Sequence, residues 1–131
     1  MTQVIAPTPD ADDAWFWKGV AEDRLLLQRC AECRLLRHPP SPMCSGCNAL
    51  AWETLPASGR ATVYSWVVSR HPTRPDADPR IVVLLDLEEG VRFVSNLVDC
   101  PLEDVRFGLP VELVFVDYDG VRLPQFRPAR S

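Results

Sequence analysis

The spacing of four cysteines constrains the fold more than any other feature of this 131-residue sequence. Cys30 and Cys33 form one C-x-x-C pair, Cys44 and Cys47 form a second, and ten residues separate the two pairs. Two residues between cysteines let both thiolates turn toward one ion, and two such pairs complete the tetrahedral site that zinc prefers. Because four cysteines leave no coordination position for water, we predict one structural zinc ion per chain rather than a catalytic one.

Two other interpretations of these cysteines are open. Four unrelated buried cysteines are one, and iron in a rubredoxin-like site, which would make the chain an electron carrier, is the other. Rubredoxins usually carry glycine directly after each pair, whereas Arg34 and Asn48 stand there, which favours zinc and no redox cofactor. Cys100 stands apart before Pro101, and we interpret it as a packed side chain rather than a reactive thiol.

Changes in composition divide the chain into four regions. We predict a flexible tail at residues 1–11, a helical segment at 12–27, a zinc ribbon at 28–55 and an OB-fold barrel at 56–128. The ribbon is too short to build its own core, so the metal is expected to support its folding. The 13 prolines, about twice the usual share, disfavour long helices and favour a mainly β fold.

Alternating and β-branched runs predict short strands in the second half of the chain. The predicted strands are Ala61–Val68, Ile81–Leu87, Val91–Leu97, Val111–Asp117 and Val121–Phe126. Asp119-Gly120 is a strong hairpin signal, and Pro124 is expected to keep the last strand at a sheet edge. Five short strands with a small insertion before the fourth favour a closed OB-type barrel, and a sandwich fragment is the alternative.

Charge and hydropathy limit the classes of partner. The 14 Lys and Arg residues against 18 Asp and Glu give a formal net charge of −4, which argues against a protein that mainly binds a phosphate backbone. Apolar stretches such as Ile81–Leu85 are far shorter than the roughly 20 residues needed to cross a bilayer. With no secretory signal at the N-terminus, the sequence predicts a cytoplasmic protein without a membrane partner.

No set of residues predicts catalysis. His38 and His71 are the only histidines; His38 lies off the ligand spacing and is interpreted as a surface or packed residue, and no catalytic partner is apparent for His71. Glycine-rich phosphate loops and Ser/His/Asp spacings are also absent from the sequence. The segment that contains Arg70, His71 and Arg74 instead offers positive charge to a phosphate-bearing ligand.

Three consecutive aromatic residues are the second candidate contact surface. Trp15, Phe16 and Trp17 cannot all point the same way on a helix. Either they wrap around the ribbon, or at least one of them, Trp15 or Trp17, contacts a partner.

The order of these segments resembles the zinc-ribbon plus OB-fold proteins known as domain of unknown function 35, which are associated with acyl-CoA. The resemblance covers about residues 12–128 and departs at Ala61, where the family often has a second glycine. The matching segments are Trp17, Leu25–Cys30 with both cysteine pairs, Pro39-Pro40, Gly59–Trp66, Gly108–Val111 and Phe126–Pro128.

The resemblance implies a non-catalytic accessory subunit of a thiolase-fold enzyme that makes or breaks carbon–carbon bonds on acyl-CoA thioesters. Some relatives pair with hot-dog-fold enoyl-CoA hydratase domains in steroid side-chain degradation, and there the partner is a lipid-transfer-protein-like thiolase that acts as a retro-aldolase. For this chain it implies a heterotetramer in which the chain stabilises its partner and helps to form the acyl-CoA channel. The predicted partner or acyl-CoA contacts are Trp15, Trp17, Arg70, His71, Arg74, Phe126 and Arg127.

A nucleic-acid-binding module is the alternative function. Zinc ribbons and OB barrels often serve in single-stranded nucleic-acid binding, and Arg70, Arg74 and Arg80 offer one local cluster of positive charge. The net charge of −4 makes nucleic acid the weaker prediction.

Overall fold

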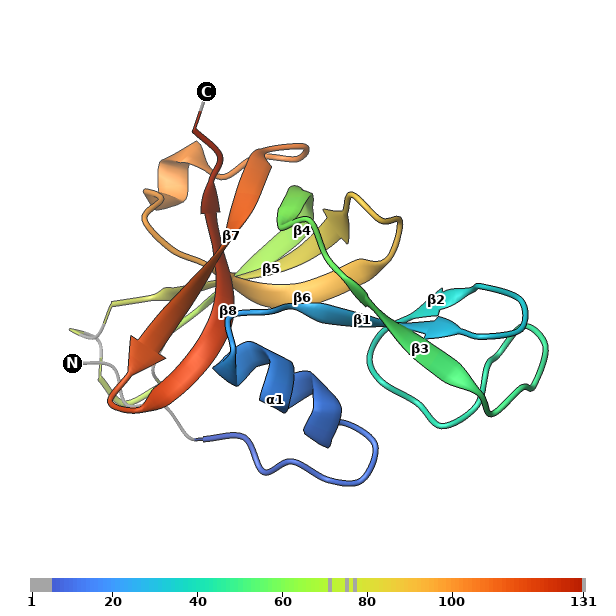
Figure 1. Cartoon of the computed structure of the whole chain (residues 1–131). Coiled ribbons are helices and arrows are strands. Elements are labelled where there is room, and N and C mark those ends of the chain that lie inside the picture. Colours follow the sequence, from blue (N-terminus) through green and yellow to red (C-terminus); the bar gives the residue numbers. More distant parts are fainter. Residues whose placement is uncertain (1–5, 71, 75, 77, 131) are drawn as a thin grey trace.

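The computed structural model describes residues 6–70, 72–74, 76 and 78–130, and it consists mainly of strands (Figure 1). A three-stranded sheet in the order β2-β1-β3 extends away from a closed barrel in the order β4-β5-β6-β8-β7. The elements are α1 (Ala14–Ala21), β1 (Leu26–Cys30), β2 (Leu36–Arg37), β3 (Trp52–Pro56), β4 (Arg60–Ser69), β5 (Arg80–Leu87), β6 (Arg92–Leu97), η1 (Leu102–Asp104), β7 (Pro110–Tyr118) and β8 (Val121–Pro128). The predicted five-stranded barrel is therefore confirmed.

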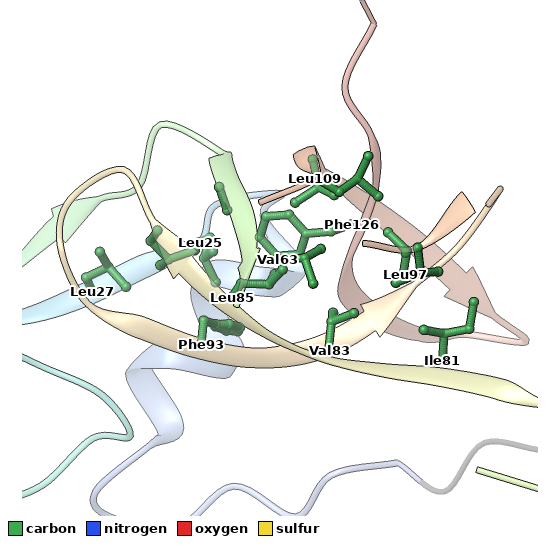
Figure 2. Close-up of a cluster of buried hydrophobic side chains, with 14 of the residues drawn as sticks. Leu25, Leu27, Val63, Ile81, Val83, Leu85, Phe93, Leu97, Leu109 and Phe126 are labelled. Carbon is green, nitrogen blue, oxygen red and sulfur yellow. The ribbon is translucent and has the colours of Figure 1, made fainter. Parts of the chain in front are cut away.

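Alternation along the barrel strands places apolar side chains inside. In β5, Ile81, Val83, Leu85 and Leu87 are buried while the residues between them are half-buried. Figure 2 shows these side chains meeting others from β4, β6 and β8 in one cluster. A β-bulge in β4, between Val63 and Ser65, shifts the register against β5. Bulges of this kind bend and twist strands, which helps a small sheet to close on itself.

The last strand does not lie at an edge, which corrects the expectation based on Pro124. β8 pairs with β7 over eight residue pairs from Val111↔Pro128 to Tyr118↔Val121, and on its other side it pairs with β6. Only Leu97↔Phe126 pairs β6 with β8, in parallel. Pro124 has no N–H to donate. Its carbonyl accepts a hydrogen bond from the Ser95 hydroxyl of β6 at 2.9 Å. β8 therefore closes the barrel between β7 and β6, with sparse backbone pairing to β6.

Helix α1 is shorter than the helical segment predicted at 12–27. It ends at Ala21, Asp23 takes a left-handed φ of 61°, and the Arg24 N–H donates to the Gly19 carbonyl at 2.8 Å. This C-terminal turn reverses the chain, so that Leu26 already begins β1. A Cβ at Gly19 would come within 3.0 Å of the Arg24 carbonyl oxygen, which explains why glycine stands there.

The hairpin predicted at Asp119-Gly120 is present. Asp119 has φ of 54° and Gly120 has φ of 90°, which is the pattern of a type I′ turn, and β7 and β8 pair directly on either side. No helix in the described part of the chain is long and apolar enough to cross a membrane.

Candidate functional site: the cysteine cluster and the aromatic surface

The four paired cysteines come together at the far end of the three-stranded sheet. Their Sγ atoms all lie within 4.8 Å of one another, and the Cys30–Cys47 and Cys33–Cys44 sulfur pairs are each 3.5 Å apart. A Zn–S bond of about 2.3 Å gives a tetrahedron with edges of about 3.8 Å, close to this arrangement. Cys30 and Cys44 are buried while Cys33 and Cys47 are exposed, so each C-x-x-C pair contributes one buried and one exposed cysteine.

The two cysteine turns repeat the same backbone hydrogen bonds. Arg34 N–H donates to the Cys30 carbonyl at 3.1 Å, and Asn48 N–H donates to the Cys44 carbonyl at 2.9 Å. Arg34 and Asn48 both adopt left-handed conformations, with φ of 70° and 64°. Glycine adopts this conformation without strain and asparagine tolerates it well, so Arg34 is the costlier residue of the two. The departure from the rubredoxin pattern therefore changes the residue at this position but not the turn.

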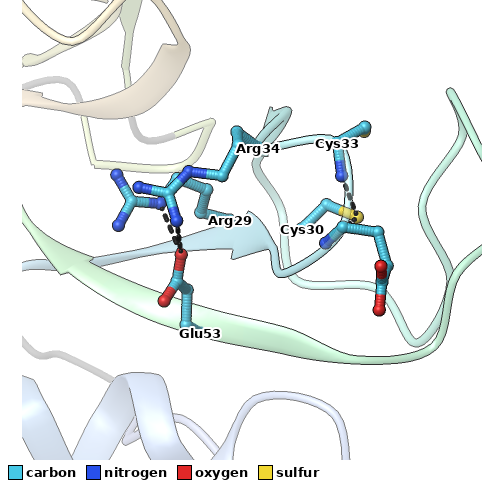
Figure 3. A network of polar contacts seen from close by, with 6 residues as sticks. Arg29, Cys30, Cys33, Arg34 and Glu53 are labelled. Atoms are coloured by element: carbon cyan, nitrogen blue, oxygen red, sulfur yellow. Dashed lines mark hydrogen bonds and ion pairs between the residues drawn. The ribbon is translucent and has the colours of Figure 1, made fainter.

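Backbone amides surround the sulfurs and favour thiolates. Glu32 and Cys33 both donate N–H groups to the Cys30 Sγ at 3.4 Å, and the Cys33 contact is drawn in Figure 3. Gly46 N–H donates to the Cys44 Sγ at 3.3 Å. Such bonds stabilise negative charge on sulfur, which is the form that binds a metal.

Mutual repulsion and backbone amides shift the pKa values of the clustered cysteines in opposite directions. The Cys33 amide lowers the pKa of Cys30 to about 6, and the Cys47 amide lowers that of Cys44. The Ala49 amide also favours the Cys47 thiolate, yet the Cys30 sulfur next to it and burial raise the pKa of Cys47 to about 12. Four adjacent thiolates cannot all ionise against one another, and a bound Zn²⁺ removes that conflict. The donor set and geometry fit a structural zinc ion.

A buried glutamine holds the loop that precedes the second cysteine pair. The Gln28 side chain is 2% exposed and pairs twice with the backbone of Ser41: its Nε2 donates to the carbonyl at 2.9 Å, and its Oε1 accepts from the N–H at 2.9 Å. Arg37 Nε donates to the same carbonyl at 3.1 Å. These bonds replace the strand pairing that this irregular loop lacks. Sequence reasoning missed this role of Gln28, and the available signal was a polar residue directly after the apolar run Leu25–Leu27.

An ion-pair network ties the first cysteine turn to β3. Arg29 Nε and Arg34 Nη1 both donate to Oε1 of Glu53, at 3.0 and 2.8 Å (Figure 3). Because Arg34 and Glu53 are exposed, each pair is worth about 0–1 kcal/mol, and the network orients the turn rather than stabilises it.

The three consecutive aromatic residues point in three directions. Trp15 lies on Trp52 of the ribbon, with ring centroids 5.0 Å apart, and its Nε1 donates to the Asp12 carbonyl at 2.8 Å. Phe16 is buried in the barrel core against Phe93. Trp17 is half-buried and lines a pocket with His38. Phe16 also lies near His38 of the ribbon, with ring centroids 5.7 Å apart, so the three rings lie against the ribbon and the barrel core together rather than against the ribbon alone.

The remaining predicted contact residues do not gather at one place. Arg70 and Arg74 are exposed between β4 and β5, and His71 lies outside the described residues. Phe126 is fully buried in the core, because it faces inward from β8, so the prediction of a surface contact is corrected (Figure 2). Arg127 is half-buried and reaches Glu112 at 3.6 Å.

Cys100 packs against the barrel core, and desolvation raises the pKa of its thiol. A raised pKa disfavours the reactive thiolate, in agreement with the interpretation of Cys100 as a packed side chain.

Together, the fold and the cysteine cluster define a zinc ribbon joined to an OB-fold barrel. Residues 17–53 match the family described as "ChsH2, rubredoxin-like zinc ribbon domain", and residues 55–116 match "ChsH2, C-terminal OB-fold domain". A "DUF35 domain-containing scaffold protein" of Methanocaldococcus jannaschii is 33% identical over 104 residues, which cover 76% of this chain and 73% of that protein. The chain belongs to the DUF35 family, as its resemblance predicted.

Two longer relatives and one solved structure are also similar to the chain. A "Probable enoyl-CoA hydratase alpha subunit" of Thermomonospora curvata is 41% identical over 94% of this chain and 39% of its own length. The "3-oxo-4,17-pregnadiene-20-carboxyl-CoA hydratase alpha subunit" of Mycobacterium tuberculosis is 34% identical over 95% of this chain and 40% of its own. The chain therefore spans about two fifths of the length of these relatives.

The solved structure is a chain of the "Ltp2-ChsH2(DUF35) aldolase". It superimposes with a TM-score of 0.86 at 40% identity and covers 93% of this chain and 98% of that chain. The match therefore extends over almost the whole of both chains.

Proposed function

We propose that this chain is a non-catalytic accessory subunit of a thiolase-fold acyl-CoA enzyme. The observation that carries the proposal is its likeness, over 98% of that chain, to a chain of the Ltp2-ChsH2(DUF35) aldolase. By analogy the partner is a lipid-transfer-protein-like aldolase or thiolase that cleaves carbon–carbon bonds in steroid or lipid side chains. The chain stabilises this partner and helps to form its acyl-CoA channel.

The composition of the site supports a binding role. Among the described residues, the four cysteines are the only group of three or more His, Cys, Asp or Glu side chains placed to hold a metal ion. In this proposal Cys30, Cys33, Cys44 and Cys47 hold one zinc ion, which fixes the ribbon and supplies no chemistry to the substrate. The zinc-held unit corresponds to residues 28–55 and the barrel unit to 56–128.

The assembly is proposed to be a heterotetramer with the aldolase, and a hot-dog hydratase domain is a further partner. Trp15, Trp17, Arg70, His71, Arg74 and Arg127 remain the proposed partner or acyl-CoA contacts. Trp15 supports this through its position, because the Trp15–Trp52 pair joins α1 to the ribbon at a surface that a partner can cover.

Purification of the tagged chain from its native cells, followed by mass spectrometry, tests the proposal. We expect a thiolase-like protein in near-equal amount, and co-expression of the two chains is expected to raise the partner's soluble yield and its acyl-CoA cleavage rate. A Cys44→Ser chain is expected to lose the partner, and Cys100→Ser is the matched control that keeps it. Recovery of nucleic acid instead, with strongly salt-dependent binding, would contradict the proposal and favour the alternative module.

A further inference from the structure

A pocket lies beside the sparsely paired stretch between β6 and β8, which we call the β6–β8 gap. Leu97↔Phe126 is the one backbone pair recorded between these two strands, and the Ser95 hydroxyl donates to the Pro124 carbonyl at 2.9 Å. Helix α1 and the turn at Pro39-Pro40 cover this gap from outside without filling it. The cavity that remains has a volume of about 320 Å³, within the range of small-molecule sites.

The walls of this pocket are flat and apolar. Phe93 stacks on His38 with ring centroids 4.6 Å apart and planes at 29°, and Phe16 lies 6.2 Å from Phe93. Trp17, Leu123 and Pro124 add to the apolar lining, together with Pro39, Pro40 and Val94. Aromatic rings with prolines beside them favour a ring-bearing ligand over a flexible chain.

The charge of the lining selects a neutral ligand. Among the described residues, no arginine or lysine lines the pocket, and Asp13 is the only carboxylate there. Desolvation lowers the pKa of His38, so its ring is neutral at physiological pH. A phosphate or carboxylate would meet a like charge here without any cation to pair with it.

Most polar side chains in the pocket lining already have a hydrogen-bond partner, and the His38 ring offers one contact to a ligand. Gln125 Oε1 already accepts from the Tyr118 hydroxyl at 2.6 Å, and Asn96 Nδ2 lies 3.5 Å from the Ile81 carbonyl. The ring nitrogens of His38, by contrast, have no hydrogen bond to any of the described residues. A neutral imidazole offers one donor and one acceptor, which suits a hydroxyl, carbonyl or amine on the ligand.

We propose that the pocket between α1, the Pro39-Pro40 turn and the β6–β8 gap binds a neutral, ring-bearing apolar ligand through the aromatic walls and the His38 ring. This site rests on the geometry of the chain alone and not on the accessory-subunit function. The described lining residues include no cation, so they disfavour the phosphate-bearing end of a coenzyme.

Two matched fluorescent probes test the charge selection on the zinc-loaded full chain. N-phenyl-1-naphthylamine is neutral, and 1-anilinonaphthalene-8-sulfonate is the same ring system with an anionic group. We expect saturable binding of the neutral probe at one site and binding of the sulfonate at least about tenfold weaker. No saturable binding of the neutral probe, or equal affinity for both, would overturn the proposal.

Two pairs of variants locate the site. Leu123→Trp fills the pocket and is expected to weaken binding of the neutral probe at least about tenfold. Leu50→Trp, at a 70% exposed ribbon position, is the control and is expected to leave that binding unchanged.

Val94→Lys places a cation on the pocket lining and is expected to strengthen binding of the sulfonate probe about tenfold. Its control is Val67→Lys, because both valines are 62% exposed barrel positions and only Val94 lines the pocket. Equal gains in Val94→Lys and Val67→Lys would place the probe elsewhere and overturn the site, even where Leu123→Trp fails to fold.

Discussion

The ribbon and the barrel hold their folds by different means. In the barrel, Val63, Val83 and Leu85 are buried within one apolar cluster that extends around all five strands. In the ribbon, Leu35, Met43 and Leu50 are exposed, and the buried residues are polar or sulfur-bearing: Gln28, Cys30, Arg37 and Cys44. The comparison indicates that hydrophobic burial holds the barrel, whereas we expect the ribbon to depend on a metal and on a few polar bonds.

The two regions share strand β1. Its pairing with β2 and β3 belongs to the ribbon, yet Leu25, just before it, and Leu27 lie in the barrel cluster (Figure 2). The barrel therefore anchors one end of the ribbon sheet, and the metal is needed at the other end.

Loss of a zinc ligand is expected to have the largest effect. Cys44→Ser should remove the zinc and unfold residues 31–51, because structural zinc contributes about 10–16 kcal/mol of apparent binding free energy in comparable small modules. Elemental analysis of zinc content and circular dichroism check this result. Cys100→Ser, which alters a cysteine away from the cluster, is the control and should retain one zinc per chain. A folded Cys44→Ser ribbon without zinc would contradict a structural metal.

A cavity in the barrel core is expected to have the next largest effect. Phe126→Ala should lower the free energy of unfolding by about 3–5 kcal/mol, because Phe126 is fully buried and its neighbours can relax only in part. Leu50→Ala, at a 70% exposed position, should change it by less than about 0.5 kcal/mol. Urea unfolding followed by fluorescence measures both values, and similar losses in the two variants would show that Phe126 is not a core residue.

Removal of the Gln28 amide is expected to weaken the ribbon moderately. Gln28→Ala leaves the Ser41 N–H without its partner and the Ser41 carbonyl with only its bond from Arg37, and it should cost about 1–3 kcal/mol, mostly in the zinc-loaded ribbon. The zinc release rate to a chelator reports this change. Thr54→Ala, at an exposed position of β3, is the control. An unchanged release rate in Gln28→Ala would mean that the loop is fixed by the metal alone.

His38 is expected to give the smallest effect, a dependence of stability on pH. Since desolvation lowers the pKa of folded His38, the unfolded chain binds a proton first as pH falls below about 6.5, and the free energy of unfolding decreases in that window. Asp13 is the only other ionisable residue that lines the same pocket. Urea unfolding of the wild type and His38→Phe, both zinc-loaded, should therefore show the wild type losing more stability between about pH 7.5 and about pH 5.5. A larger loss in the variant would reverse the sign and refute this assignment.

The sequence predicted what local patterns determine and missed what depends on distant contacts. Paired cysteine spacing predicted the cluster, and Asp119-Gly120 predicted the hairpin, because both are set within a few residues. The two-residue strand β2 has too little alternation to be predicted, and it exists through its pairing with β1. The inward direction of Phe126 and the β6–β8 gap depend on how β8 meets β6, which no local pattern records.

Hydrogen–deuterium exchange with and without zinc tests the central comparison most directly. The zinc-loaded chain should protect both regions, and removal of zinc by a chelator should abolish protection across residues 31–51 while β4 to β8 remain protected. Retained protection in the chelated ribbon, or loss of protection in both regions together, would contradict the account that a metal holds the ribbon and a hydrophobic core holds the barrel.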